Sequence, residues 1–297
     1  MSTFLILLKR NVKLFFKDRG MFFTSLITPA ILLVLYGAFL ADVYRDSFTA
    51  SLTPGMEVSD RVIDGLVGGQ LISSILAISC VTVAFCSNFL MVQDKALGNA
   101  KDLLISPVRS SILSASYYVA TLISTLIICY TALALCLGYV AFVGWYLTLS
   151  DVLLLMLDVL LLVLFGTAIS SLVNSFLKTQ GQISAVGTIV SSGYGFICGA
   201  YMPISSFGEG LRHVISFLPG TYGTSLMRNH AIDGPLRQME EEGVPAEVIE
   251  GMKEALDCRL YFFEHEVAIS TMYLVLVSSI LALIGIYILM NALSKRK

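Results

Sequence analysis

Charged residues are scarce in this chain, and that scarcity is the first constraint on its class. Only 13% of the 297 residues are Asp, Glu, Lys or Arg, whereas 56% are hydrophobic and the mean hydropathy is +0.82. A soluble domain carries about a quarter charged residues. The deficit therefore indicates that lipid rather than water surrounds most of the chain.

The sequence also lacks the short motifs of common catalytic sites. It has no G-x-x-x-x-G-K-[ST] loop to hold ATP phosphates, and neither H-E-x-x-H nor G-x-S-x-G occurs. The three histidines fall in one segment, and the six cysteines form no C-x-x-C pair. We therefore expect no enzymatic site, no metal site and no disulfide framework, and we interpret the cysteines as small packing residues.

Long apolar runs take the place of such motifs. A bilayer core of about 30 Å requires about 20 helical residues. Six stretches meet this requirement, approximately 21–40, 65–91, 115–143, 152–173, 182–201 and 268–290. No small-residue processing site follows a compact apolar core near the N-terminus, so we do not expect a cleavable signal there. The pattern predicts an all-α membrane protein with six spans.

The basic residues predict the orientation of these spans. One side of the proposed membrane receives 12 of the 19 Lys and Arg residues with only Asp18, Asp94 and Asp102 as acids; the basic residues are Lys9, Arg10, Lys13, Lys17, Arg19, Lys95, Lys101, Arg109, Lys178, Lys295, Arg296 and Lys297. Basic loops stay in the cytoplasm. Both termini are therefore predicted to be cytoplasmic.

Residues 1–20 are predicted to form a cytoplasmic helix that lies at the membrane surface. Lys9, Arg10, Lys13 and Lys17 share one face at 100° per residue, and apolar side chains occupy another. Such a helix lies in the headgroup plane rather than crossing the membrane. Two readings stay open: a simple anchor to anionic lipid, or a lever that contacts a cytoplasmic partner and tilts the first span.

The cytoplasmic segment 91–113 is longer than a turn between two spans requires. Its length predicts a short helix that reaches into a groove of another protein, although a plain basic loop is the alternative. The segment opens with polar residues, is loosened by a glycine, and continues into an apolar patch and a Ser-Pro pair; the residues concerned are Gln93, Asp94, Lys95, Gly98, Asp102, Leu103, Leu104, Ser106 and Pro107.

On the outer side, the segment 203–267 is predicted to contain a short re-entrant helix and a small acidic region. Pro203 ends the fifth span because it cannot donate a backbone hydrogen bond. Residues 207–218 form an amphipathic stretch of roughly 18 Å, too short to span. Phe207 and Leu211 are its candidate gate residues, and a rigid cap without contact to cargo is the alternative. The acidic residues that follow either attract cationic substrates or form a solvated surface.

Two features inside the spans complete the candidate path. Gly187, Ser191, Gly195 and Gly199 form a small-x-x-x-small ladder in the fifth span. It permits close helix approach, either within the chain or at a seam between subunits. Asp158 is an acid placed within a span, where it either faces the path or pairs with a neighbour.

In this arrangement the sequence resembles the membrane subunit of a type-2 ABC exporter, of the bacterial drug- and antimicrobial-export branch. The resemblance covers essentially the whole chain, with residues 21–297 as the six-span domain. It rests on the order of spans and on two loose motifs, an acidic and Gly-containing segment before "LL-x-[ST]-P", and "G-x-x-x-P-x-S-x-[FL]" before "P-x-[ST]-Y" and an Arg. The matching residues are Asp94, Gly98, Leu103, Leu104, Ser106 and Pro107, then Gly199, Pro203, Ser205, Phe207, Pro219, Thr221, Tyr222 and Arg228.

The resemblance implies a permease in the bacterial plasma membrane that moves an amphiphilic substrate such as a drug, peptide or lipid-like molecule. It implies a second permease, identical or paralogous, and two cytoplasmic ATPase subunits that bind ATP and magnesium; this chain would hold no cofactor. Membrane lipids are further partners, and no nucleic acid is expected. The competing functions are a stand-alone channel or ion-coupled carrier and, less favoured, a lipid-processing membrane enzyme.

Overall fold

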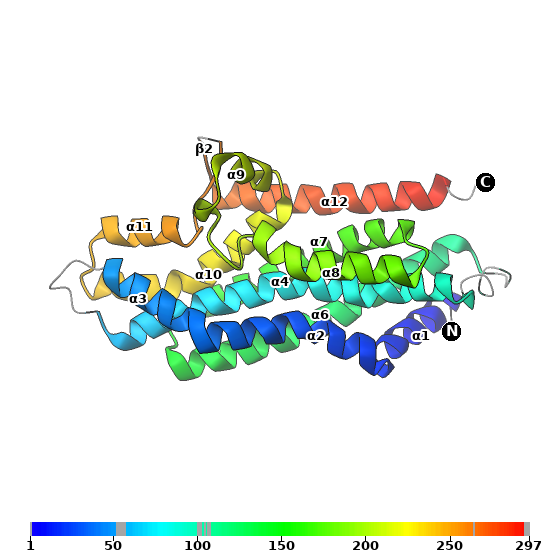
Figure 1. The fold of residues 1–297 in the computed structure, drawn as a ribbon, viewed down its shortest axis with the longest axis horizontal. Helices are drawn as coiled ribbons and strands as arrows, with labels where there is room; N and C mark the ends of the chain where they lie inside the picture. Colours follow the sequence, from blue (N-terminus) through cyan, green and yellow to red (C-terminus); the bar gives the residue numbers. More distant parts are fainter. Residues whose placement is uncertain are drawn as a thin grey trace.

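The chain forms an elongated bundle of helices whose N- and C-terminal ends lie at the same end of the bundle (Figure 1). The structure is a computed structural model that describes residues 2–51, 58–99, 103, 105, 108–263 and 265–293. We call the end with both termini the terminal end, and the other the distal end.

Among the described helices, four are long and apolar enough to cross a membrane: α4 (Asp60–Ala96), α6 (Ser110–Val143), α7 (Leu149–Phe176) and α12 (Ile269–Leu293). These helices contain the predicted spans 65–91, 115–143 and 152–173 and most of 268–290. Helix α4 lies in the centre and packs against α6 and α7, and also against α2 (Arg19–Leu35), α8 (Gln180–Ile197) and α10 (Pro219–Glu241). The composition therefore correctly predicted an all-α membrane fold.

The two remaining predicted spans correspond to less apolar or shorter helices. The first falls on α2 (Arg19–Leu35) and the π-helical segment η1 (Tyr36–Leu40), which continue into α3 (Ala41–Ser51). The fifth falls on α8 (Gln180–Ile197), which begins with a capping box formed by Thr179 and Gln182. Neither helix is both long and apolar enough to count as a span by composition. The six-span count thus stays a prediction.

Helix α1 (Thr3–Lys17) precedes α2 and packs mainly against α6. Its buried side chains are Leu7, Asn11 and Phe15, whereas Leu5 and Phe16 on the predicted apolar face are exposed. The helix is therefore attached to the bundle by one stripe and leaves apolar side chains free. Its position at a membrane surface stays a prediction.

The segment after the fifth predicted span differs from the sequence analysis. A 3₁₀ turn, η2 (Ile204–Ser206), precedes α9 (Glu209–Ser216), which has eight residues instead of the twelve expected at 207–218. Gly208 occupies the N-cap of α9. Beyond α9 and α10, α11 (Ala246–Ala255) is followed by a hairpin of β1 (Leu260–Phe262) and β2 (His265–Val267), paired antiparallel with Leu260 opposite Val267.

Helix α10 (Pro219–Glu241) is the element that the sequence analysis missed. It packs against α4, α7 and α12, and most of its residues from Gly220 to Met239 are buried. Its start follows a common rule, since Pro219 occupies the first turn, where its missing N–H is not needed. The helix brings Arg228 and His230 into the interior of the bundle.

Candidate functional site

At the terminal end, a polar junction joins α1 to the last turn of α4. The guanidinium of Arg10 donates to both carboxylate oxygens of Asp94, at 2.8 and 3.1 Å. Asp94 is nearly buried, with 4% of its side chain exposed, whereas Arg10 keeps 30%. The hydrogen bond to Asp94 raises the pKa of Arg10 above its ordinary value. A bidentate pair of this kind is among the stronger charge-assisted contacts.

Asp94 also accepts hydrogen bonds from two other groups. The hydroxyl of Tyr117 on α6 donates to it at 2.5 Å, and the side-chain amide of Asn99 donates at 3.1 Å. Asn11 of α1 donates to Ser116 of α6 at 3.3 Å. Arg10, Asp94 and Tyr117 thus tie three helices together; we call these three residues the terminal junction.

The next residues of the predicted docking segment attach the last turn of α4 to α7 and end the helix. Lys95 donates to the carbonyl oxygens of Asn174 and Ser175 in the last turn of α7, at 3.4 and 3.1 Å, where a cation complements the helix dipole. Gly98 ends α4 with φ of +85°, a backbone conformation that favours glycine. Gln93 is half-buried in the same turn.

The rest of the predicted docking segment is only partly described. Asp102, Leu104, Ser106 and Pro107 lie outside the described residues, while Leu103 is partly buried against the core. On α1, Lys9, Lys13 and Lys17 are exposed and make no ion pair with any described residue. Of the four predicted basic residues, only Arg10 therefore forms an ion pair with the part of the docking segment that the structure describes.

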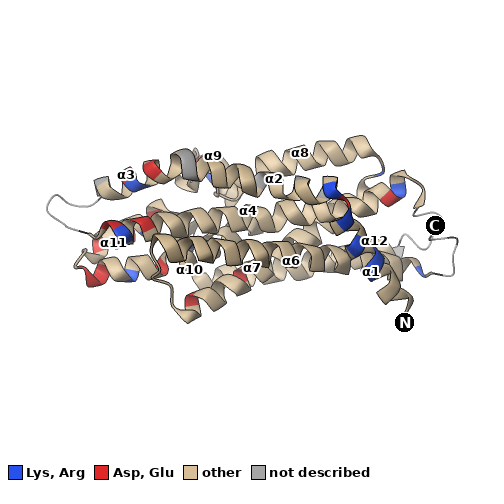
Figure 2. Cartoon of the chain, turned by 90° about the horizontal axis from the view of Figure 1, so that it is seen from below, with Lys and Arg blue, Asp and Glu red and all other residues tan. Residues whose placement is uncertain are grey.

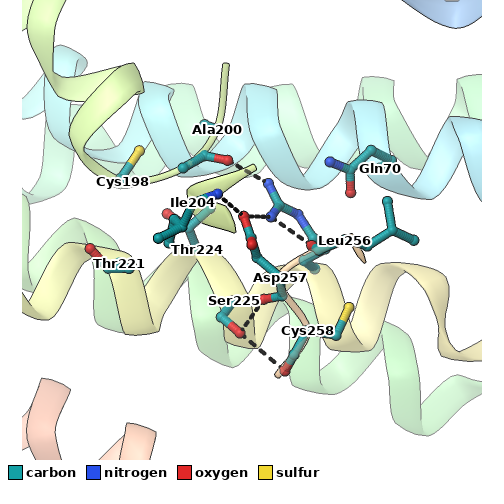
Figure 3. Close-up of polar contacts among 12 residues, drawn as sticks. Gln70, Cys198, Ala200, Ile204, Thr221, Thr224, Ser225, Leu256, Asp257 and Cys258 are labelled. Atoms are coloured by element: carbon teal, nitrogen blue, oxygen red, sulfur yellow. Dashed lines mark hydrogen bonds and ion pairs between the residues drawn. The ribbon is translucent and has the colours of Figure 1, made fainter. Parts of the chain in front are cut away.

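At the distal end, Arg228 fixes the turn that ends α8. Its guanidinium donates to the carbonyl oxygen of Gly199 at 2.9 Å and to that of Leu256 at 2.7 Å, and pairs with Asp257 at 3.3 Å. The Asp257 carboxylate also accepts from the backbone N–H of Ile204 at 2.7 Å (Figure 3). Both partners are almost completely buried. Burial raises the pKa of Asp257, and the Arg228 charge opposes that shift.

This arrangement assigns physical roles to the distal motif residues. Gly199 has φ of +74°, so the αL position after α8 favours glycine. The prediction that Pro203 ends the fifth span was wrong, because α8 ends earlier, at Ile197, and Pro203 is the N-cap of η2. Tyr222 donates to the carbonyl oxygen of Ser216 at 2.5 Å, and Thr221 to that of Ile215 at 3.3 Å, which fastens α9 to α10. The contacts of the motif residues therefore hold the end of α8, α9 and α10 together as one unit.

Two glycines of the small-x-x-x-small ladder in α8 make close contacts with other residues of the same chain. A Cβ atom at Gly187 would approach the Phe89 ring at 3.3 Å, and one at Gly195 would overlap the ring of Tyr201. The geometry favours the intrachain explanation for these two positions. Their role in a translocation path stays a prediction.

Asp158 lies in a buried polar cluster between α7, α10 and α12. Its carboxylate accepts from the Tyr273 hydroxyl at 2.8 Å and lies 2.6 Å from Nδ1 of His230. Only 1% of the Asp158 side chain is exposed. The structure therefore places this acid against neighbours of its own chain, one of the two alternatives left by the sequence.

A cavity of about 600 Å³, which we call the distal cavity, opens in the distal half of the bundle between α9, the start of α10 and the hairpin. Charged side chains such as Arg212 and Glu254 line it together with aromatic residues such as Tyr261. Of the two predicted gate residues, Phe207 is half-buried and Leu211 is 49% exposed. Neither lines this cavity.

The bundle of apolar helices is that of a multi-pass membrane protein, and a comparison of the sequence with protein-family models agrees with this class. The model of the ABC-2 type transporter family matches residues 2–230, most of the chain. The chain therefore belongs to this family and is a permease subunit of an ABC transporter. It is not itself catalytic, because ATP hydrolysis takes place in a partner ATPase. No curated protein matches the sequence significantly.

Several residues of these sites were not singled out from the sequence. Asp257 was counted only among the acids of the outer segment, and Tyr117, His230 and Tyr273 carried no distinguishing signal. Arg228 was selected only through the family resemblance, as the Arg that follows Tyr222 at a less strict spacing. A signal for the others would require knowledge of which helices pack together.

Proposed function

We propose that this permease exports an amphiphilic substrate from a bacterial cell, as one of two permeases driven by two ATPase subunits. The terminal junction is the observation that carries the proposal. It attaches the start of the predicted docking segment to α1, so that a partner bound to this segment would pull on both α1 and α4.

The distribution of charge supports a cytoplasmic position for the terminal end. Figure 2 shows Lys and Arg on α1 and beside the termini, and Asp and Glu gathered at the distal end over α10 and α11. Cytoplasmic loops carry the excess of basic residues. The exposed Lys9, Lys13 and Lys17 then face anionic headgroups or the ATPase.

If the terminal end is cytoplasmic, the distal cavity lies on the exit side, and its lining supports an amphiphilic cargo. It combines charged groups, including Arg212, with the exposed rings of Tyr261 and Phe263. Ligand sites combine apolar walls with a few polar groups that fix orientation. A small ion would not require such walls, which argues against an ion channel.

A charge exchange tests the terminal junction. Arg10→Glu or Asp94→Arg alone places like charges together and should abolish co-purification of the ATPase and ATP-driven transport. Because Asp94 is nearly buried whereas Arg10 is partly exposed, disrupting the pair costs at most about 3–5 kcal/mol. The double variant restores opposite charges and should recover both properties at least in part. Lys178→Gln, which removes an exposed cation elsewhere at the terminal end, is the matched control.

Transport itself is tested in sealed vesicles. The chain and its ATPase should accumulate a fluorescent amphiphile against its gradient only with ATP, and differently tagged copies of permease should co-purify. Uphill movement by the chain alone would refute the proposal and favour an ion-coupled carrier. Normal transport by Arg10→Glu would refute only the role of the junction.

A further inference from the structure

A small cavity lies between α1, α4 and α6, beside the terminal junction. Its volume is about 10 Å³, and it is lined by Asn11, Phe15, Ser87, Leu90, Tyr117, Ala120, Thr121 and Ser124. All eight residues are buried, with between 1 and 8% of each exposed. The cavity therefore lies inside the bundle rather than on its surface.

The cavity lies where the packing between α1 and α4 is thin. Tyr117 belongs both to its lining and to the terminal junction, and Ser87 precedes Asp94 by seven residues, or about 10 Å along α4. Helix α1 packs mainly against α6 and touches α4 much less. The cavity is thus a gap that remains between α1 and the central helix of the bundle.

Five of the eight lining residues are polar, and three of them have hydroxyl groups without a partner. The buried hydroxyl of Ser87 has no hydrogen-bond partner among the described residues. The hydroxyls of Thr121 and Ser124 likewise form no hydrogen bond with a described residue. A hydroxyl that is buried without a hydrogen bond costs free energy. Three such groups around one cavity therefore indicate a ligand that can both donate and accept hydrogen bonds.

Other buried hydroxyls on the same helices are paired with their own backbone. On α4, Ser79 donates to the carbonyl oxygen of Ile75 at 2.6 Å, and on α6, Ser116 donates to that of Leu113 at 2.7 Å. Serine and threonine commonly form this local bond inside helices. The three unpaired hydroxyls at the cavity do not form it, so they remain available to a molecule bound there.

The size and the chemistry of the cavity select water as this molecule. A cavity of about 10–15 Å³ holds one water molecule, which typically forms about three hydrogen bonds. Asn11 adds a donor, because its side-chain amide donates to Ser116 at 3.3 Å and keeps a second N–H. Among the described lining residues there is no carboxylate, which disfavours a metal cation.

We propose that this cavity binds one structural water molecule that bridges α1, α4 and α6. The water bonds to the hydroxyls of Ser87, Thr121 and Ser124, and the free N–H of Asn11 is its contact on α1. It therefore adds a hydrogen-bonded link between α1 and α4 beside the terminal junction, where few side chains meet directly. The site depends on the packing of three helices and not on the substrate or the ATPase that the permease uses.

Two valine substitutions on α6 distinguish a hydrated cavity from a dry one. Thr121→Val replaces the hydroxyl with a methyl group of similar size and removes a hydrogen bond to the water. We expect it to lower the melting temperature of the purified full-length chain by about 1–6 °C, the effect of one net hydrogen bond. Thr125→Val is the matched control, because the Thr125 hydroxyl is also buried without a described partner but does not line the cavity. This control should leave the melting temperature unchanged or raise it.

Radiolytic footprinting of the unchanged chain in lipid nanodiscs detects the water directly. A short X-ray pulse generates hydroxyl radicals from bound water as well as from solvent, so side chains beside a bound water are oxidised although they are buried. After correction for intrinsic reactivity, Phe15, Leu90 and Tyr117 should be oxidised faster than Phe165, which is 4% exposed and lies outside the cavity. Oxidation of all three at the rate of Phe165, or an unchanged or higher melting temperature for Thr121→Val, would overturn the proposal.

Discussion

Two neighbouring glycines of α4 provide a sharp test of the position of α10. A Cβ atom added at Gly69 would lie 2.5 Å from the carbonyl oxygen of Ala231 and 2.9 Å from a methyl group of Ile232. At Gly68 the nearest atoms are side-chain atoms of Val140 and Tyr139, at 3.7 and 3.8 Å. Alanine should therefore fit at position 68 and collide with the α10 backbone at position 69.

The expected difference in stability between the two variants follows from two free-energy contributions. Both substitutions replace glycine within a helix, which favours the folded state by about 1 kcal/mol in each case. This term cancels when the two variants are compared. Only Gly69→Ala adds overpacking against the backbone, at about 1–3 kcal/mol. We therefore expect Gly68→Ala to be neutral or stabilised and Gly69→Ala to be about 1–3 kcal/mol less stable than Gly68→Ala.

Thermal unfolding in detergent measures the difference, at roughly 2–4 °C for each kcal/mol in domains approaching this size. Transport by the purified complex should fall only for Gly69→Ala, because α10 carries Arg228 and positions the distal turn. Equal melting temperatures for the two variants would show that α10 does not cross α4 at Gly69, and the described packing of the bundle would be refuted.

Three further perturbations test the buried sites. Arg228→Met should lower the free energy of unfolding by about 3–5 kcal/mol because it leaves Asp257 buried without its cation. Asp257→Asn should lower it by a similar amount because it leaves the Arg228 guanidinium buried without its anion, and thermal unfolding measures both. Asp158→Asn should cost about 1–3 kcal/mol through weaker hydrogen bonds in the same assay. Normal transport by this variant would then exclude a substrate or proton role. Gly195→Leu should reduce transport because the new side chain overlaps Tyr201, and normal transport rates would contradict that packing.

The sequence predicted the apolar helices but not their full lengths. Hydropathy located 65–91, whereas α4 extends from Asp60 to Ala96. At one end Asp94 is paired inside the protein, and at the other Asp60 pairs with Arg45 at the surface. Helix α10 escaped detection because it is buried by protein instead of lipid and so needs no continuous apolar run. Burial by neighbouring helices leaves little trace in composition.

The sites show the same limit. Arg10 and Asp94 were both selected, one as part of a basic helix face and the other as the start of a docking segment. Their direct pairing joins positions 84 residues apart, and nothing in the sequence links them. Asp257 was indistinguishable from the other acids of its segment until the structure placed Arg228 beside it. The sequence shows which residues can form ion pairs, whereas which of them pair with each other depends on tertiary packing.

Helix α4 connects the two sites, and this connection leads to a final prediction. Its 37 residues extend over about 55 Å, with Asp94 bound to α1 and α6 near one end and Gly69 against α10 near the other. Because α4 is packed by neighbours along its length, a shift imposed at the terminal end is expected to reach α10 as movement of a stiff helix.

A double-mutant cycle between Asp94→Asn and Gly69→Ala tests this coupling, with substrate-stimulated ATP hydrolysis as the measurement. Distant independent sites add within about 0.3–0.5 kcal/mol. If α4 transmits the shift, the effects of the two substitutions on the stimulated rate should deviate from additivity by about 0.5–2 kcal/mol. The pair Asp94→Asn and Gly68→Ala serves as the control, because Gly68 does not touch α10. Additive effects in both pairs would mean that the two ends of the bundle respond to the ATPase separately.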